Sequence, residues 1–132
     1  MKPPPRKPLP FSFVLDLLDA REVVIRPMFG CYALSLGGRI TLVLRKRRDH
    51  PSMNGVWVAT KKEHHESLRV LMPCLRSIPL LGKGETNWQL IPERHEEFER
   101  TVLVVCDLVL RGDRRIGAVP KERSGARSRS AR

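Results

Sequence analysis

Two short apolar segments around a glycine pair give the clearest local pattern in this 132-residue chain. Residues 31–36 and 39–45 are rich in β-prone side chains, and Gly37 and Gly38 lie between them. Because glycine readily adopts the positive φ angles of a two-residue turn, the pattern predicts a β-hairpin.

Four more segments are predicted to be extended. Residues 22–26 are expected to form a strand that Pro27 ends, and residues 55–59 and 86–91 are expected to form two others. Residues 74–79 are predicted to be a strand or an extended segment. The chain therefore offers enough strands for one sheet.

Helical spacing of apolar residues predicts two short helices. The first covers residues 11–18. The second begins at Thr60, because Thr60 and Glu63 match a capping box, and it ends near Met72, before Pro73.

The last predicted helix has the strongest local signals. Pro92 suits the first helical position, acidic residues follow it, and Gly112 can cap the end. An apolar stripe along this helix is expected to lie across the sheet. Its members are Phe98, Val102, Val105, Cys106 and Val109. The order of elements predicts an α+β fold, with three helices packed on a mainly antiparallel, twisted sheet.

Most of the net charge of +11 lies near the two ends of the chain. Residues 1–10 carry +3 and residues 113–132 carry +5, which leaves +3 for residues 11–112. The first segment is rich in proline and the last in arginine and serine, and residues 124–132 have no apolar anchor. We therefore predict a disordered leader at 1–10, one domain at 11–112 and a disordered tail at 113–132.

No recognisable catalytic or metal-binding motif occurs in the sequence. The three cysteines are far apart and form no Cys-x-x-Cys pair. His64 and His65 would point about 100° apart on a helix, which is not the i, i+4 spacing of a metal pair. We expect a non-enzymatic protein without cofactor or metal, although a site assembled from distant segments stays an alternative. Unpaired cysteines and the absence of an apolar run of about 18–20 residues predict a cytoplasmic location, without membrane contact.

A longer motif around the hairpin carries a resemblance to a known family. A leading helix precedes the motif, and residues 88–92 lead into an acidic, amphipathic helix. The motif residues are Arg26, Met28, Phe29, Gly30, Tyr32, Gly37 and Gly38. In these residues and in this order of features the chain resembles the N-terminal domain of the TfoX/Sxy family, bacterial proteins connected with competence regulation. The resemblance covers roughly residues 11–111.

The resemblance implies a fold and a type of role, but no reaction. Many members of the family have a further glycine where this chain has Cys31, and members tied to competence carry a second, helical domain that we do not expect here. What carries over is a single regulatory or protein-interaction domain, acting on an unknown protein partner or by self-association.

Within the motif, Met28 and Phe29 are interpreted as core residues, with Gly30 turning the backbone. On this interpretation Phe29→Ala costs roughly 3–5 kcal/mol of stability. If Phe29 is instead an exposed contact residue, only partner binding should suffer. Cys31 is interpreted as a small buried side chain and not as a reactive thiol.

One basic cluster inside the predicted domain supports an alternative function. Arg45, Lys46, Arg47 and Arg48 are candidate phosphate contacts, although such a run is also typical of a solvated loop. With the basic termini they would bind nucleic acid weakly, without sequence preference and in a salt-sensitive way. Trp57 and Trp88 lie among apolar residues, and we interpret them as packing residues and not as base-stacking platforms.

Overall fold

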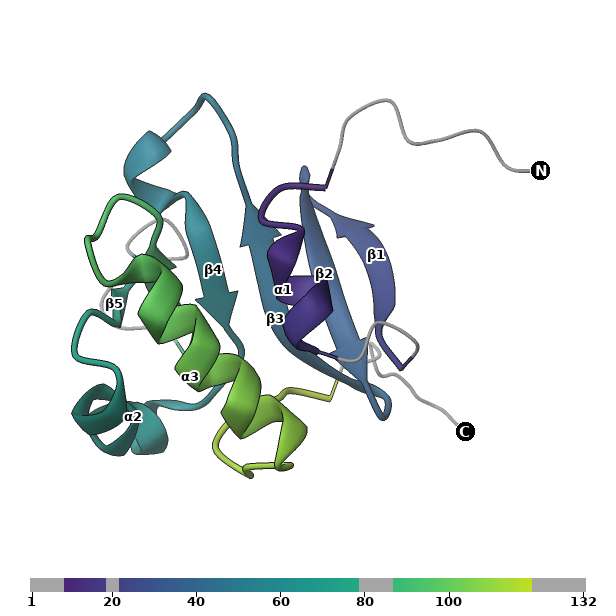
Figure 1. The fold of residues 1–132 in the computed structure, drawn as a ribbon, viewed down its shortest axis with the longest axis vertical. Helices are drawn as coiled ribbons and strands as arrows, with labels where there is room; N and C mark the ends of the chain where they lie inside the picture. Colours follow the sequence, from purple (N-terminus) through teal and green to yellow (C-terminus); the bar gives the residue numbers. More distant parts are fainter. Residues whose placement is uncertain (1–8, 19–21, 79–86, 120–132) are drawn as a thin grey trace, which may run out of the picture.

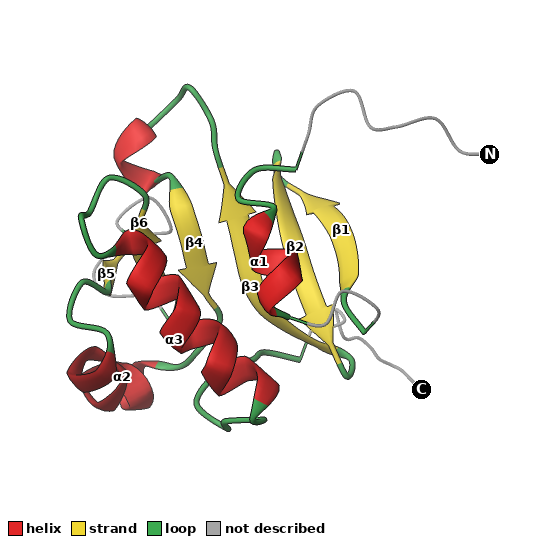
Figure 2. Ribbon diagram, in the orientation of Figure 1, coloured by secondary structure: helices red, strands yellow, loops and turns green. Residues whose placement is uncertain are grey.

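The structure, a computed structural model, describes residues 9–18, 22–78 and 87–119. Its elements are α1 (Phe13–Leu17), β1 (Val24–Met28), β2 (Cys31–Leu36), β3 (Arg39–Arg45), β4 (Gly55–Val58), α2 (His65–Leu71), β5 (Arg76–Ser77), β6 (Gln89–Pro92) and α3 (Phe98–Leu110). The strands form one antiparallel sheet in the order β1-β2-β3-β4-β6-β5. Figures 1 and 2 show α1 and α3 lying across the same face of the sheet, with α2 beside α3. The predicted α+β fold is confirmed.

Both faces of the sheet are covered by apolar packing. Successive strand residues point to opposite faces, so the central strand β3, buried from Thr41 to Arg45, contributes to two clusters. The cluster on the helix side takes Leu42 and Leu44 from β3 and Val102 and Val105 from α3. The cluster on the other side consists of Cys31, Ala33, Val43, Met53, Trp57, Ile78 and Leu90. This double burial explains why β3 is a continuous apolar run.

The first strand continues through Pro27, so the prediction that Pro27 ends it is wrong. Pro27 pairs with Tyr32 in the antiparallel register, and Met28 pairs with Cys31 next to the turn. In a two-residue hairpin, the pair that flanks the turn exchanges hydrogen bonds, and the next pair along does not. The backbone nitrogen of Pro27 therefore points away from β2, toward the open edge of the sheet. A missing N–H costs nothing there, since β1 is the edge strand.

The second helix does not begin with a capping box. Thr60 is buried, and its hydroxyl donates a 2.5 Å hydrogen bond to the carbonyl of Arg115. A 3-10 turn at Lys62–His64 precedes α2, and no side chain of the described residues caps the helix. The Thr60 hydroxyl, which the local pattern assigned to the helix cap, therefore bonds to a backbone carbonyl from a distant part of the chain.

The last helix begins later than predicted but ends where expected. Pro92 is the final residue of β6, and the chain turns before α3 starts at Phe98. The amide of Glu93 donates to Asn54 O (2.9 Å), which extends the sheet contact past Pro92. At the other end, Gly112 N–H donates to Val109 O, as the predicted cap requires. The apolar stripe faces the core, with Val102 and Val105 fully buried.

The packed unit extends past the predicted boundary at residue 112. Ile116 is buried in the core, Gly117 N–H donates to Ala59 O, and Ala118 exchanges backbone hydrogen bonds with Ile40. The prediction of a disordered segment is therefore wrong for residues 113–119, because a short bridge and one apolar anchor hold them. The leader up to residue 8 and the tail from 120 lie outside the described residues. Among the described helices, none has the length and apolar character needed to cross a bilayer.

Candidate functional site

The turn between β1 and β2 presents an aromatic side chain to solvent. Phe29 and Gly30 have φ angles of 50° and 79°, the two positive values of a tight hairpin turn. The Phe29 side chain is 91% exposed, so the prediction that it fills the core is wrong. Met28 is half-buried and packs against the cluster that contains Trp57. Since Met28 and Cys31 close the ladder, the two residues between them extend beyond the sheet.

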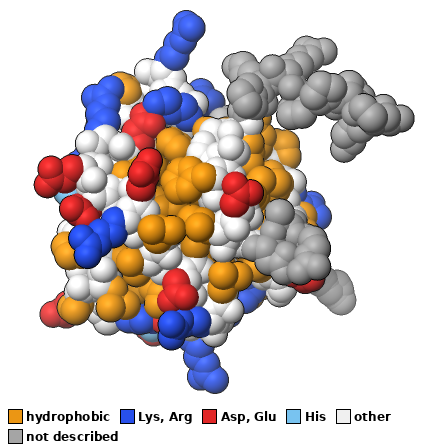
Figure 3. Space-filling view, in the orientation of Figure 1, with side chains coloured by type: hydrophobic (Ala, Val, Ile, Leu, Met, Phe, Trp, Pro, Cys, Tyr) orange, Lys and Arg blue, Asp and Glu red, His pale blue; other side chains and the backbone are white. Residues whose placement is uncertain are grey.

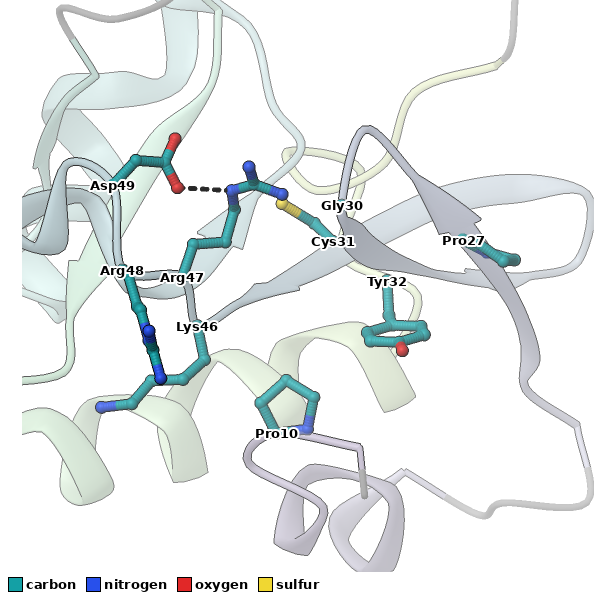
Figure 4. Close-up of a pocket in the computed structure, with 9 residues that line it drawn as sticks. All are labelled: Pro10, Pro27, Gly30, Cys31, Tyr32, Lys46, Arg47, Arg48 and Asp49. Atoms are coloured by element: carbon teal, nitrogen blue, oxygen red, sulfur yellow. Dashed lines mark hydrogen bonds and ion pairs between the residues drawn. The ribbon is translucent and has the colours of Figure 1, made fainter. Parts of the chain in front are cut away.

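A glycine is required at position 30 by a close contact as well as by the turn. A Cβ at this position would lie 1.7 Å from Nη1 of Arg47, so the guanidinium group occupies the space that a side chain would fill. Figure 4 shows Arg47 extending from the β3–β4 connection toward Gly30 and Cys31. The hairpin motif and the basic cluster, which are separate in the sequence, therefore meet here.

Arg45 is a structural residue and is not available to phosphates, contrary to its predicted role. Its side chain is 2% exposed and donates to Asn54 Oδ1 (2.7 Å), His50 O (3.0 Å) and Asp49 O (2.9 Å). Because alternate strand residues share a face, Arg45 lies on the same side of β3 as buried Val43. That alternation was the signal in the sequence for an inward-facing arginine.

Asn54 organises the basic loop, the segment after β3 that carries Lys46, Arg47 and Arg48. Asn54 was not among the residues predicted from the sequence. Besides accepting from Arg45, its Oδ1 accepts from the Arg47 amide (2.9 Å), and its Nδ2 donates to Arg47 O (2.8 Å). Asn54 is itself buried. One amide side chain thus fixes the backbone on which Lys46, Arg47 and Arg48 stand.

The three remaining basic residues differ in their freedom to bind an anion. Lys46 forms an ion pair with Glu93, and Arg47 pairs with Asp49 through a 2.7 Å Nε–Oδ1 contact. The Arg47 hydrogen bond holds the pKa of the Asp49 carboxyl below its ordinary value. Arg48 is exposed and makes no ion pair within the described residues. Only one cation of the predicted cluster is thus free of an internal carboxylate.

A cleft of about 810 Å³ lies between the hairpin and the basic loop. In Figure 4, Lys46 and Arg48 extend on the side of Pro10, while Arg47 points toward Cys31. A smaller hollow of about 220 Å³ borders Phe29, Met28 and Trp57. The residues that line the large cleft are Pro10, Pro27, Gly30, Cys31, Tyr32, Lys46, Arg47, Arg48 and Asp49.

The thiol in this cleft is not activated. Cys31 is 7% exposed, and burial raises the pKa of its thiol, although the charges of Arg45 and Arg47 act in the opposite direction. The Sγ–H group donates a weak hydrogen bond to Phe29 O (3.7 Å). The interpretation of Cys31 as a buried side chain is confirmed. In α3, burial raises the pKa of the Cys106 thiol to about 12.

The other predicted residues lie away from the cleft. Gly37 and Gly38 turn the opposite end of β2, as predicted. Trp57 is buried, donates to Met53 O (2.9 Å) and meets Trp88 edge to face, which confirms the packing interpretation. His65 is buried and contacts Asn87 O (2.8 Å) through Nε2. Within the ranges that the structure describes, no three His, Cys, Asp or Glu residues gather as metal ligands would.

Comparison of the chain with protein-family models, with curated proteins and with solved structures found no match. The resemblance to the N-terminal domain of the TfoX/Sxy family therefore stays a prediction from the hairpin motif.

Proposed function

We propose that this chain is a non-enzymatic protein-interaction domain, of the regulatory type that its sequence resembles, and that the β1–β2 turn is its contact surface. Phe29 supports this proposal best. Its ring is 91% exposed at the tip of a hairpin, where it contributes nothing to the core.

Phe29 lowers the stability of the fold at its position. Its φ of 50° lies in the left-handed region, which costs a side chain with a Cβ roughly 1–2 kcal/mol. Exposure of the ring leaves its apolar surface in water. A strained, exposed aromatic residue in a two-residue turn is typical of a binding contact, because such strain is kept where it serves a function and the turn presents the side chain to solvent.

The surroundings of Phe29 indicate the chemistry of the partner. Met28 and Trp57 border the same hollow as Phe29 and supply apolar surface beside it. Arg26 is exposed on β1, and Arg48 stands free beside the cleft. This surface fits a protein with an apolar pocket for the phenyl ring and carboxylates around that pocket.

Weak nucleic-acid binding is the second candidate, and the cleft is the observation that favours it. Lys46, Arg47 and Arg48 line one hollow in a chain of net charge +11. Glu93 and Asp49 compete with phosphates for the first two, so only Arg48 is fully available. We therefore expect the termini to supply most of any such affinity.

An affinity pull-down with the full chain, with and without nuclease, tests the proposal. The matched variant is Phe29→Asn, which removes the ring while asparagine accepts the positive φ angle. We expect the wild-type chain to retain a protein partner after nuclease treatment and Phe29→Asn to lose it. The control is Val119→Asn, which removes another exposed apolar side chain, next to Ala118 and its bridge to Ile40 near the opposite end of β2.

Three outcomes would contradict the proposal. A partner recovered equally well with Phe29→Asn would place the contact elsewhere. A partner lost on nuclease treatment would favour the nucleic-acid function. Recovery of no specific partner by the wild-type chain would remove the basis for an interaction domain.

A further inference from the structure

The outer surface of α3 carries exposed apolar residues between charges of both signs. Leu103 and Leu110 are 52% and 53% exposed, although they stand on the helix that crosses the core. On the neighbouring α2, Val70 and Leu71 are 76% and 45% exposed. Figure 3 shows many apolar side chains at the surface over the helices on this face, among a few charged ones.

The exposed residues of α3 share one side of the helix. At about 100° per residue, four of them fall within a sector of about 80°, opposite the buried stripe. Leu103 and Leu110 are seven residues apart, so they stand two turns apart along this sector. The four residues are Arg100, Leu103, Asp107 and Leu110.

This side of α3 is complementary to itself. If two α3 helices cross antiparallel about a two-fold axis between residues 103 and 104, Arg100 of each copy faces Asp107 of the other. Leu103 then faces Val104 of the second copy. Val104 borders a groove of about 410 Å³ between α2 and α3, which Val70 and Leu71 also line. Val70, Leu71 and Val104 give this groove an apolar side for the incoming leucine, while Glu97 and Arg100 also line it.

Charge also favours a second copy at this face. Two chains of net charge +11 repel each other overall, so a contact between them needs a face on which both signs occur. On α3 the signs are mixed, since Glu99 and Asp107 stand beside Arg100 and Arg111. The internal pairs Arg100–Glu97 (3.5 Å) and Arg111–Asp107 (2.8 Å) join exposed side chains and can exchange partners at low cost.

We propose that two copies of this chain associate through α3, with reciprocal Arg100–Asp107 ion pairs around an apolar centre at Leu103 and Val104. The contact between two 13-residue helices is small, so association is reversible and depends on concentration. This contact is separate from Phe29 and does not depend on the function proposed for the turn.

Charge reversal on the full chain tests the proposal by analytical ultracentrifugation over a roughly 100-fold concentration range. Arg100→Asp places two Asp–Asp contacts in the dimer, and Asp107→Arg places two Arg–Arg contacts. We expect each single variant to weaken the association at least about tenfold. The double variant Arg100→Asp, Asp107→Arg restores opposite charges at the same net charge, and its association should return close to that of the wild type.

Two further variants test whether the dimer forms through α3 or through the β1–β2 turn. Leu103→Ser should weaken the dimer, while Phe29→Asn should leave it unchanged, and the melting temperature of each variant checks the fold. A wild-type chain that stays monomeric over the whole range would overturn the proposal. So would single charge reversals without effect, a double variant that stays as weak as the singles, or a dimer lost in Phe29→Asn.

Discussion

At the scale of single residues, backbone conformation decides the position of Phe29 more than its side chain does. A two-residue hairpin turn points its central residues away from the sheet, so an aromatic ring there is exposed although it is apolar. Arg45 is the opposite case. Its charged side chain is buried because strand alternation turns it inward and Asn54 accepts its hydrogen bond.

Phe29→Asn should raise the free energy of unfolding by about 0.5–1 kcal/mol, because asparagine tolerates the left-handed region and Asn-Gly favours this turn. Phe29→Ala should change stability little, since no core packing is lost. Urea denaturation of both variants measures the effect. A loss of several kcal/mol in Phe29→Ala would mean that the ring is packed after all.

Asp113 makes the stability of the fold depend on acid pH. Arg115 donates to both carboxylate oxygens (2.9 and 2.7 Å), and these hydrogen bonds lower the pKa of Asp113 to about 2 from an ordinary 3.8. Because the pKa of Asp113 is lower in the folded than in the unfolded protein, its charge stabilises the fold at pH values above about 4. This stabilisation is lost as the pH falls from about 4 through about 2. We expect Asp113→Asn to cost about 1 kcal/mol at pH 7, a modest value because the pair is partly solvated.

Denaturant unfolding of the wild type and Asp113→Asn at pH 7 and at pH 2 measures this contribution. The difference between the two proteins should be present at pH 7 and largely gone near pH 2. A difference that is the same at both pH values would show that Asp113 acts through something other than its charge.

At the scale of elements, the β4–β6 pairing depends on one close backbone approach. Gly55 has a φ of 143°, and a Cβ there would lie 2.1 Å from the carbonyl oxygen of Ile91. The neighbouring backbone cannot move aside without separating the two strands.

Gly55→Ala should therefore cost more than about 3 kcal/mol, combining backbone strain with strand separation. The matched control is Gly38→Ala, where φ is also positive at 79° but no atom of the described residues lies within 4 Å of the added Cβ. That substitution should cost only about 1–2 kcal/mol, the price of the backbone conformation alone. Equal losses in the two variants, measured by thermal unfolding, would show that the approach to Ile91 is not limiting.

At the scale of the whole molecule, charge and fold occupy different parts of the chain. Residues 9–119 hold 17 basic and 13 acidic residues of the chain, while the rest of the net charge of +11 lies in residues 1–8 and 120–132. Leu9 packs against the core, and Ala118 forms a β-bridge with Ile40. A shortened chain should therefore keep Leu9 and Ala118, as residues 9–119 do.

We expect the 9–119 chain to unfold cooperatively and to bind oligonucleotides much more weakly than the full chain. Affinity of the full chain should fall steeply with salt and show little sequence preference, because neutralised phosphates release counterions. Titration with duplex and single-stranded oligonucleotides at two salt concentrations measures both chains. Tight, salt-resistant and sequence-selective binding by the 9–119 chain would place nucleic-acid recognition first.

Features that depend on neighbouring residues could be predicted from the sequence. The β2–β3 hairpin follows from its β-prone runs and the Gly37-Gly38 turn, and the end of α3 follows from Gly112. The apolar stripe of α3 likewise follows from helical periodicity. Each of these signals lies within a few residues of the structure it produces.

Other features depend on the partners that side chains and strands find in distant parts of the chain. Thr60 bonds to Arg115, 55 residues away, and so does not cap α2. Pro27 stays in β1 because β1 has no neighbour on its outer edge among the described strands. Arg47 meets Gly30 of the β1–β2 turn, although the two residues belong to separate segments of the sequence. Register, strand order and the packing of distant segments set these contacts, and local pattern carries no information about them.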